Sequence, residues 1–135
     1  MNIPAKDVAD LLAAQASLSL TFATNVFIWR EPASPDNCVT IFDTPGMPPQ
    51  LTLGAKADDG YYYPSIQIRV RNNSYEDGWD LVNAIKEYLH GLKNIEQGGS
   101  IYDVIRCTQE PFLLDWDEND RSRLVSTFNI NRKEV

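Results

Sequence analysis

The chain has 135 residues, the size of one ordinary domain that can bury a core without disulfides or metals, so we expect a single domain over residues 1–135. With 43% hydrophobic and 23% charged residues, and no apolar run long enough to cross a bilayer, the composition is that of a globular protein with no membrane partner. The formal net charge of -7 argues against a protein that holds nucleic acid tightly through its phosphates, because such binding needs a clustered basic surface.

The N-terminal segment predicts a helix and no export signal. MNIPAKDVADLL carries an acid where a signal peptide would be basic and then apolar. From residue 3 to about residue 16 the apolar residues follow a helical spacing, and Pro4 suits the first helical position. We expect the apolar side of this helix to lie on a sheet and the polar side to face solvent, with Val8, Leu11 and Leu12 on the first and Lys6, Asp7 and Asp10 on the second.

Two short strands and a proline-rich segment come next. Residues 25–30 and 38–43 are predicted as strands, joined by a connection at 31–37 whose prolines force a turn. The prolines and the glycine of 44–50 argue against a helix or a central strand, so we expect the chain to leave the body of the domain there. Residues 51–61 predict either a surface loop or an extended arm that reaches a neighbouring molecule.

The clearest pattern is a strand, a turn and a helix. Residues 65–71 alternate between apolar and polar, which is the period of a strand with one buried face, and this period puts Arg69 and Arg71 on the wetter face. Two asparagines then supply turn chemistry, and Ser74 is the expected N-cap of the helix. The helix is expected to pack on the sheet through an apolar stripe made of Trp79, Val82, Ile85, Leu89 and Leu92.

The C-terminal third predicts three more strands. Residues 101–107 follow a glycine turn and could pair in parallel with 65–71 through a right-handed crossover. Residues 112–116 and 124–130 are expected to form a hairpin around the acidic turn DEND, and the charged tail at 131–135 is expected to fray. Together these elements predict an α/β (α+β) fold, a two-layer sandwich with a mixed sheet of about five strands and one or two helices on one face.

Two blocks of the sequence resemble one family of phage proteins. The first is YYYPSIQIRVR with its turn and SYEDGWDLVNAIKEYLHGL, and the second, upstream, is NVFIWREPASPDNCVTIFDTPGMPP. Their order resembles the phage minor capsid protein family, which is similar to the tail terminators, or tail-completion proteins, of long-tailed phages. The two blocks cover roughly half of the chain.

The resemblance implies a structural virion protein and no enzyme or cofactor. It implies a homohexameric ring that sits on the last ring of the major tail tube protein, ends its polymerisation and presents a joining surface to the head completion or connector protein. DNA would pass through this ring without specific binding. The implied location is the head–tail junction of the virion, after assembly in the host cytoplasm. A head–tail connector or neck protein of similar fold is the alternative within the same class.

The acidic residues before the last strand leave an enzyme open as another alternative. Asp115, Asp117, Glu118 and Asp120 cluster closely enough to hold a hard cation in a metal-dependent hydrolase or nuclease. The run DWDEND lacks the spacing and the glycine of a calcium loop, so a solvated acidic turn is the favoured interpretation. His90, the single histidine, lies near a predicted helix end, and no nucleophile motif or phosphate-binding glycine loop is present.

A third hypothesis is a small adaptor domain that binds one protein partner as a monomer or dimer. Cys38 and Cys107 lie far apart in the sequence, and we expect both to be reduced and partly buried.

The candidate contact residues are aromatic or charged side chains at strand ends and in the predicted arm. Three consecutive tyrosines cannot all point into a core, and tyrosine is enriched in interfaces, although packing inside the domain is the alternative. No catalytic, cofactor-binding or metal-binding residue is assigned. The candidate protein-interface residues are Trp29, Leu51, Leu53, Asp58, Asp59, Tyr61, Tyr62, Tyr63, Arg69, Arg71, Trp116 and Asp117.

Overall fold

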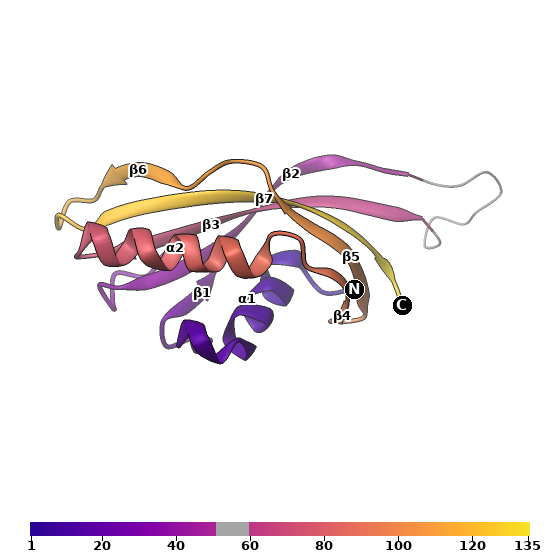
Figure 1. Cartoon of the computed structure of the whole chain (residues 1–135), viewed down its shortest axis with the longest axis horizontal. Helices are drawn as coiled ribbons and strands as arrows, with labels where there is room; N and C mark the ends of the chain where they lie inside the picture. The colour runs from indigo at the N-terminus through magenta and orange to yellow at the C-terminus, as the bar shows by residue number, and fades with distance from the viewer. Residues whose placement is uncertain (51–59) are drawn as a thin grey trace.

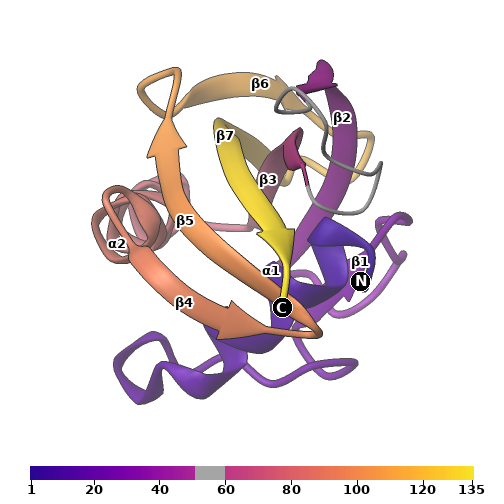
Figure 2. The same cartoon turned by 90° about the vertical axis from the view of Figure 1, so that its right-hand side faces the viewer.

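The computed structural model describes residues 1–50 and 60–135. In this part of the chain a curled mixed sheet of seven strands packs against two α-helices (Figures 1 and 2). The predicted class, a mixed sheet covered by helices in an α+β fold, is confirmed, with seven strands where about five were expected. No helix among the described residues is long and apolar enough to cross a membrane.

The helices begin where the sequence predicts, but only one of them has a local cap. Helix α2 (Tyr75–Leu89) starts after Ser74, whose hydroxyl accepts a hydrogen bond from the Asp77 backbone N–H at 3.2 Å. Helix α1 (Pro4–Ala14) has no side-chain cap from the preceding residue. Its Ala5 N–H donates instead to Asp43 of a sheet strand at 3.1 Å, so the sheet caps this helix. A short 3₁₀ helix, η1 (Ala16–Leu18), follows α1.

The strands make one sheet in which the last strand of the chain is central. Their order is β1-β2-β3-β7-β5-β4, and β6 pairs with β7 beside β5. Only the β1–β2 pair is parallel among the described strands. The strands are β1 (Val26–Ile28), β2 (Cys38–Gln50), β3 (Tyr61–Asn72), β4 (Lys93–Gln97), β5 (Ser100–Cys107), β6 (Phe112–Trp116) and β7 (Ser122–Glu134).

Strand β7 corrects two predictions. It lies between β3 and β5 and is antiparallel to both, so the predicted direct parallel pairing of the strands on either side of α2 is wrong. The prediction that residues 131–135 fray is also wrong, because β7 continues to Glu134, which pairs with Ser100 of β5. The predicted hairpin of β6 with β7 is confirmed.

The core lies between the helices and one face of the sheet. The alternation predicted for β3 is confirmed, because Ile66, Ile68 and Val70 are fully buried. The stripe predicted for α2 is confirmed at Val82, Ile85 and Leu89, but Leu92 lies beyond the end of the helix, partly buried against the core. At the start of the stripe Trp79 is 40% exposed. Gly78 takes that place, since a Cβ there would lie 3.0 Å from Leu124 Cδ1. The other large core side chains are Leu12, Ile41, Ile85, Leu89, Tyr102, Ile105, Leu124, Phe128 and Ile130.

The proline-rich segment 44–50 is neither a helix nor a central strand, as expected, but it stays in the sheet where the chain was expected to leave the body of the domain. It continues β2 and pairs with β3 through two register shifts, as far as Gln50 opposite Tyr61. Prolines fit here because β1 pairs only with residues 39–41 of β2, which leaves the other edge of 44–50 without a strand among the described residues. Residues 44–50 and 60–64, called the arm below, extend away from the helices (Figure 1).

Candidate assembly surfaces

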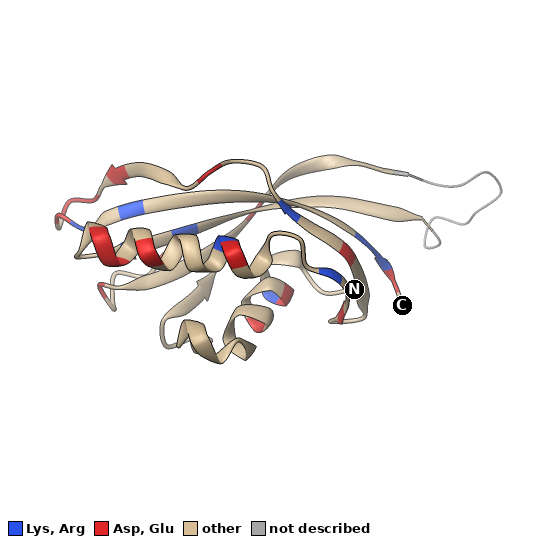
Figure 3. Cartoon of the chain, in the orientation of Figure 1, with Lys and Arg blue, Asp and Glu red and all other residues tan. Residues whose placement is uncertain are grey.

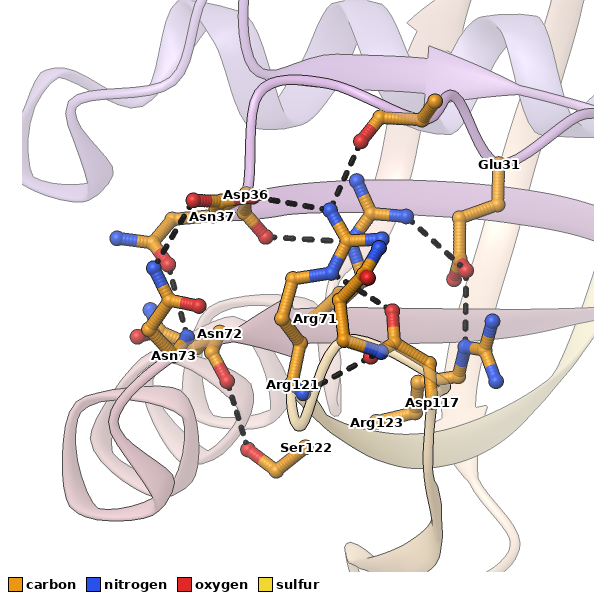
Figure 4. A network of polar contacts seen from close by, with 12 residues as sticks. Glu31, Asp36, Asn37, Arg71, Asn72, Asn73, Asp117, Arg121, Ser122 and Arg123 are labelled. Atoms are coloured by element: carbon orange, nitrogen blue, oxygen red, sulfur yellow. Dashed lines mark hydrogen bonds and ion pairs between the residues drawn. The ribbon is translucent and has the colours of Figure 1, made fainter.

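A network of ion pairs joins the 29–37 connection to β3 and β7 (Figure 4). Glu31 Oε1 accepts hydrogen bonds from Arg71 Nη1 at 3.3 Å and from Arg123 Nε at 2.8 Å. Arg71 also donates to two backbone carbonyl oxygens of the connection, those of Pro35 at 2.7 Å and Asp36 at 3.1 Å. The side chain of Arg71 is only 2% exposed, so the prediction that it lies on the wetter face is wrong. Arg71 keeps its place in the two-residue alternation of β3, but the 29–37 connection folds over its side chain.

A second part of this network holds the acidic turn between β6 and β7. Arg121 Nε donates to Asp117 Oδ2 at 2.7 Å, and its Nη1 reaches the Ala33 carbonyl oxygen at 2.8 Å and Asp36 Oδ1 at 3.0 Å. Burial opposes the charged form of Asp117, but hydrogen bonds from Arg121 and Asn119 outweigh it and hold the pKa of Asp117 below its ordinary value. The carboxylate therefore stays ionised at neutral pH and fixes the turn. We call Glu31, Asp36, Arg71, Asp117, Arg121 and Arg123 the loop network.

The loop network does not support the metal-dependent hydrolase hypothesis. Asp117 is paired with Arg121, and Asp115 with Arg123 at 3.1 Å, so guanidinium groups occupy the places that a cation would take. No group of three or more His, Cys, Asp or Glu side chains among residues 1–50 and 60–135 could hold a metal ion. His90 is exposed, and its Nδ1 accepts a hydrogen bond from the Cys107 N–H at 2.9 Å. Cys38 and Cys107 are both free, and Cys38 is the more deeply buried.

A separate buried cluster ties α1 to the far end of β7. Asp7 is fully buried, so the prediction that it faces solvent is wrong. Its Oδ2 accepts a short hydrogen bond from the Tyr102 hydroxyl and lies 3.7 Å from Arg132 Nη1. Arg132 Nη1 also donates to the Asn2 carbonyl oxygen at 2.8 Å. The two ends of the described chain meet here, and the N-terminal amine lies 3.9 Å from Glu134 (Figure 2).

This cluster predicts a loss of stability in alkali. Burial, and next the hydrogen bond to Asp7, raise the pKa of Tyr102 far above its ordinary value, so the folded chain keeps the phenol neutral. An unfolded tyrosine ionises near pH 10, so the free energy of unfolding should fall as pH rises above about 10. Urea unfolding at pH 8 and pH 11 should show a smaller fall for Tyr102→Phe than for the unchanged chain. The variant of the exposed Tyr75, Tyr75→Phe, should keep the full fall, and equal falls in both variants would contradict the assignment to Tyr102.

The arm carries exposed apolar side chains. Met47 is 67% exposed and Tyr61 is 39% exposed, whereas Tyr62 and Tyr63 are half-buried. The close approach of the two strands requires a glycine, because a Cβ on Gly46 would lie 2.1 Å from the Tyr63 carbonyl oxygen. A pocket of about 220 Å³ opens beside the arm and is lined by Met47, Pro48, Tyr63, Arg106, Asn129, Ile130 and Asn131. Of the candidate contact residues, Leu51, Leu53, Asp58 and Asp59 lie outside the described residues.

The remaining candidate contact residues are not gathered in one place. Trp29 is 49% exposed and donates through Nε1 to Asp43, beside α1. Arg69 is half-buried on the sheet, with its guanidinium 4.7 Å from the centre of the Phe42 ring. Asp117 is buried in the loop network, as is Arg71, so these two side chains hold the fold together and present little surface to a partner. Their predicted interface role is untested, as is that of the exposed residues.

Trp116 belongs to an exposed aromatic group that the sequence did not reveal in full. Tyr75 stacks on Trp79, with ring centres 6.4 Å apart and planes at 9°, and on Trp116, with centres 6.1 Å apart and planes at 29°. The three rings, called the aromatic ladder below, are 40%, 40% and 51% exposed. The signal for Trp79 was the spacing 78, 82, 85 and 89, which puts Gly78 on the buried stripe and Trp79 beside it.

Comparisons with known proteins agree with this fold and identify the family. A family model described as "Bacteriophage tail terminator protein" matches residues 8–134. A search of curated proteins found no match. The chain is similar to a solved chain titled "Virion of native gene transfer agent (GTA) particle", with 13% identity, a TM-score of 0.66, and 96% of this chain and 93% of that chain covered. A second solved chain has 12% identity and a TM-score of 0.56, with 96% and 90% covered.

At these identities the two solved chains show a shared fold alone. The family match is of another kind, because it extends from within α1 to the end of β7 and so takes in every described strand. The chain therefore belongs to the bacteriophage tail terminator family, a family of structural proteins of the phage tail.

Proposed function

We propose that the chain, as a single domain, forms a homohexameric ring that caps the tail tube, stops its polymerisation and presents a surface for the head connector. The observation that carries this proposal is the family match over residues 8–134. The partners are other copies of the chain, the major tail tube protein and the head completion protein. The protein acts at the head–tail junction of the virion after assembly in the host cytoplasm, by shape recognition and without bond chemistry.

The charge and the solved neighbour support this role. A closed ring needs a head-to-tail interface between two different patches of each copy. In this proposal the arm and the opposite end of the sheet, which lie at the two ends of the molecule (Figure 1), supply these patches. A net charge of -7 suits a ring through which DNA passes without being held. The neighbour of similar fold comes from a virion particle, which is the setting proposed for this chain.

Light scattering coupled to size-exclusion chromatography tests the ring. We expect a species of six chains across a range of concentrations, alone or after addition of tube protein, and a ring in negative-stain images. A monomer at every concentration, with tube protein present, would remove the ring and favour the adaptor hypothesis.

A charge placed in the arm is expected to weaken the ring. Met47→Glu puts a charge on an exposed apolar side chain of the arm. If the arm seats on a neighbouring copy, the dissociation constant of the ring should rise by at least about tenfold, the effect of losing a well-buried contact of about 1.4 kcal/mol. Ser17→Glu makes the same change of charge on the exposed η1 segment and is the control. Equal ring stability in both variants would remove the arm from the interface.

A further inference from the structure

The aromatic ladder is an apolar surface that the fold itself leaves uncovered. Tyr75 and Trp79 come from the first turns of α2, and Trp116 from the end of β6, so two elements bring the rings together. Their exposed fractions are 40%, 40% and 51%. Tryptophan and tyrosine are the residues that most often anchor protein interfaces, and three in contact form a patch large enough to receive a side chain. A pocket of about 330 Å³ lies against Tyr75, Glu76 and Trp79.

The rings of the ladder lack a cation contact that four other rings among the described residues make. In the part of the chain that the structure describes, each of these four rings has a Lys or Arg within 6 Å of its centre. These pairs are Lys6 with Phe22 at 4.4 Å, Arg69 with Phe42 at 4.7 Å, Lys133 with Tyr61 at 5.3 Å and Arg132 with Tyr102 at 5.8 Å. No such pair involves the ladder within residues 1–50 and 60–135. No cation of the described residues therefore competes with an external cation for the ring faces that the stacking leaves free.

Exposed carboxylates flank the ladder residues in the sequence and have no ion-pair partner among the described residues. Glu76, Asp77 and Asp80 are exposed on the first turns of α2, and Glu118 and Asp120 are exposed in the turn that follows Trp116 (Figure 3). Among the described residues none of these five has an ion pair. Glu76 and Asp77, in the first turn of α2, also offset the positive end of the helix dipole, which would otherwise repel a cation. We call these five residues the acidic rim.

The two arginines that flank Ser122, the β7 residue paired with Trp116, are already engaged. Arg121 is bonded to Asp117 and Asp36, and Arg123 to Glu31 and Asp115. Breaking either set would leave a carboxylate without its cation, and for the buried Asp117 this would carry a high free-energy cost. These two arginines are therefore held in the loop network and do not pair with the rim.

We propose that the aromatic ladder and its acidic rim form a docking site for a cationic segment of a partner protein. Arginine side chains stack on the open ring faces and pair with the rim carboxylates. Arginine fits better than lysine because its planar guanidinium both stacks on an indole and donates to a carboxylate. The proposal does not rest on the ring, because a single chain carries the whole site.

Peptide binding tests the site directly. Three labelled peptides of equal length, alternating glycine with arginine, lysine or glutamate, are titrated with the full chain and followed by fluorescence anisotropy. We expect the arginine peptide to bind most tightly and the lysine peptide more weakly, with no binding of the glutamate peptide. Binding should weaken as salt rises, because part of the attraction is between exposed charges.

Variants separate the rings from the charges. Trp79→Ala and Trp116→Ala should each weaken binding of the arginine peptide by at least about tenfold, as expected for an interface anchor. Trp29→Ala is the matched control, because Trp29 is 49% exposed but lies outside the acidic rim. The double variant Glu76→Gln/Asp80→Asn keeps all three rings and should weaken binding at low salt and less at high salt. Urea unfolding of each variant checks that the fold is retained.

Several outcomes would overturn the proposal. One is unchanged binding in the Trp79 and Trp116 variants, and another is equal binding of the arginine and glutamate peptides. The proposal would also be overturned if none of the three peptides bound. A self-association that disappears in Trp79→Ala would assign the ladder to a second copy of the chain instead. A failed ring with intact arginine-peptide binding would contradict the proposed function and leave this site standing.

Discussion

Replacing Arg71 by alanine is expected to lower the free energy of unfolding by about 3–5 kcal/mol, the effect of removing one partner from a buried ion pair. The side chain is 2% exposed and makes three hydrogen bonds to the 29–37 connection, one to Glu31 and two to backbone carbonyl oxygens. Without it those carbonyl oxygens lose their donor, and Glu31 keeps only Arg123. Urea unfolding followed by circular dichroism measures the change.

Arg69→Ala is the matched control for this variant. Arg69 comes two residues earlier on the same face of β3, is half-buried, and has no ion pair among the described residues. Its loss should lower the free energy of unfolding by about 1 kcal/mol or less, the size of a partly exposed cation–π contact. Equal losses in the two variants would mean that the loop network adds no more stability than the strand position itself.

Replacing Asp7 by alanine is expected to lower the free energy of unfolding by about 3 kcal/mol, because it leaves the buried Arg132 without its carboxylate. Asp7 is fully buried, and its loss also removes the acceptor of the Tyr102 hydroxyl. Helix α1 should then detach from the sheet more readily. Hydrogen exchange of the α1 amides should show this as faster exchange than in the unchanged chain.

Asp10→Ala is the control on the same helix. Asp10 lies one turn further along and pairs with Lys6 at 2.6 Å, with its side chain 34% exposed. Such exposed pairs at four-residue spacing contribute about 0.3–0.5 kcal/mol, so the unfolding midpoint should barely move. A loss for Asp10→Ala as large as that for Asp7→Ala would contradict the buried cluster as the anchor of α1.

Local signals were enough to predict most elements of this fold. The helix that follows Ser74 depends on a cap and a 3.6-residue period, and both lie within a few residues of each other. Strand β4 was missed because Lys93–Gln97 is polar apart from Ile95 and becomes a strand only by pairing with β5. The central position of β7 could not be predicted either, since it depends on pairing with strands from three separate parts of the chain.

The burial of the charged side chains was harder to predict than the elements. The periodic pattern of the sequence assigns Asp7 and Arg71 to one face of their element, but it does not say what covers that face. Asp7 is covered because Arg132 and Tyr102 come from the other end of the chain, and Arg71 because a proline-rich connection folds back over it. The aromatic ladder was missed for a related reason, since Trp116 reaches Tyr75 only when β6 pairs with β7.

The position of β7 decides when this sheet can form. Its partners β3, β5 and β6 all precede it in the chain, and among the described residues β3 pairs with neither β5 nor β6. During synthesis the ribosome must therefore release two incomplete halves, each with an unpaired strand edge and part of the core exposed. The two sets of strands become one sheet only when residues 122–134 emerge and pair with both of them. Folding of this domain is thus a late, nearly single event, and a nascent chain stalled before β7 would be a substrate for chaperones and proteases rather than for assembly.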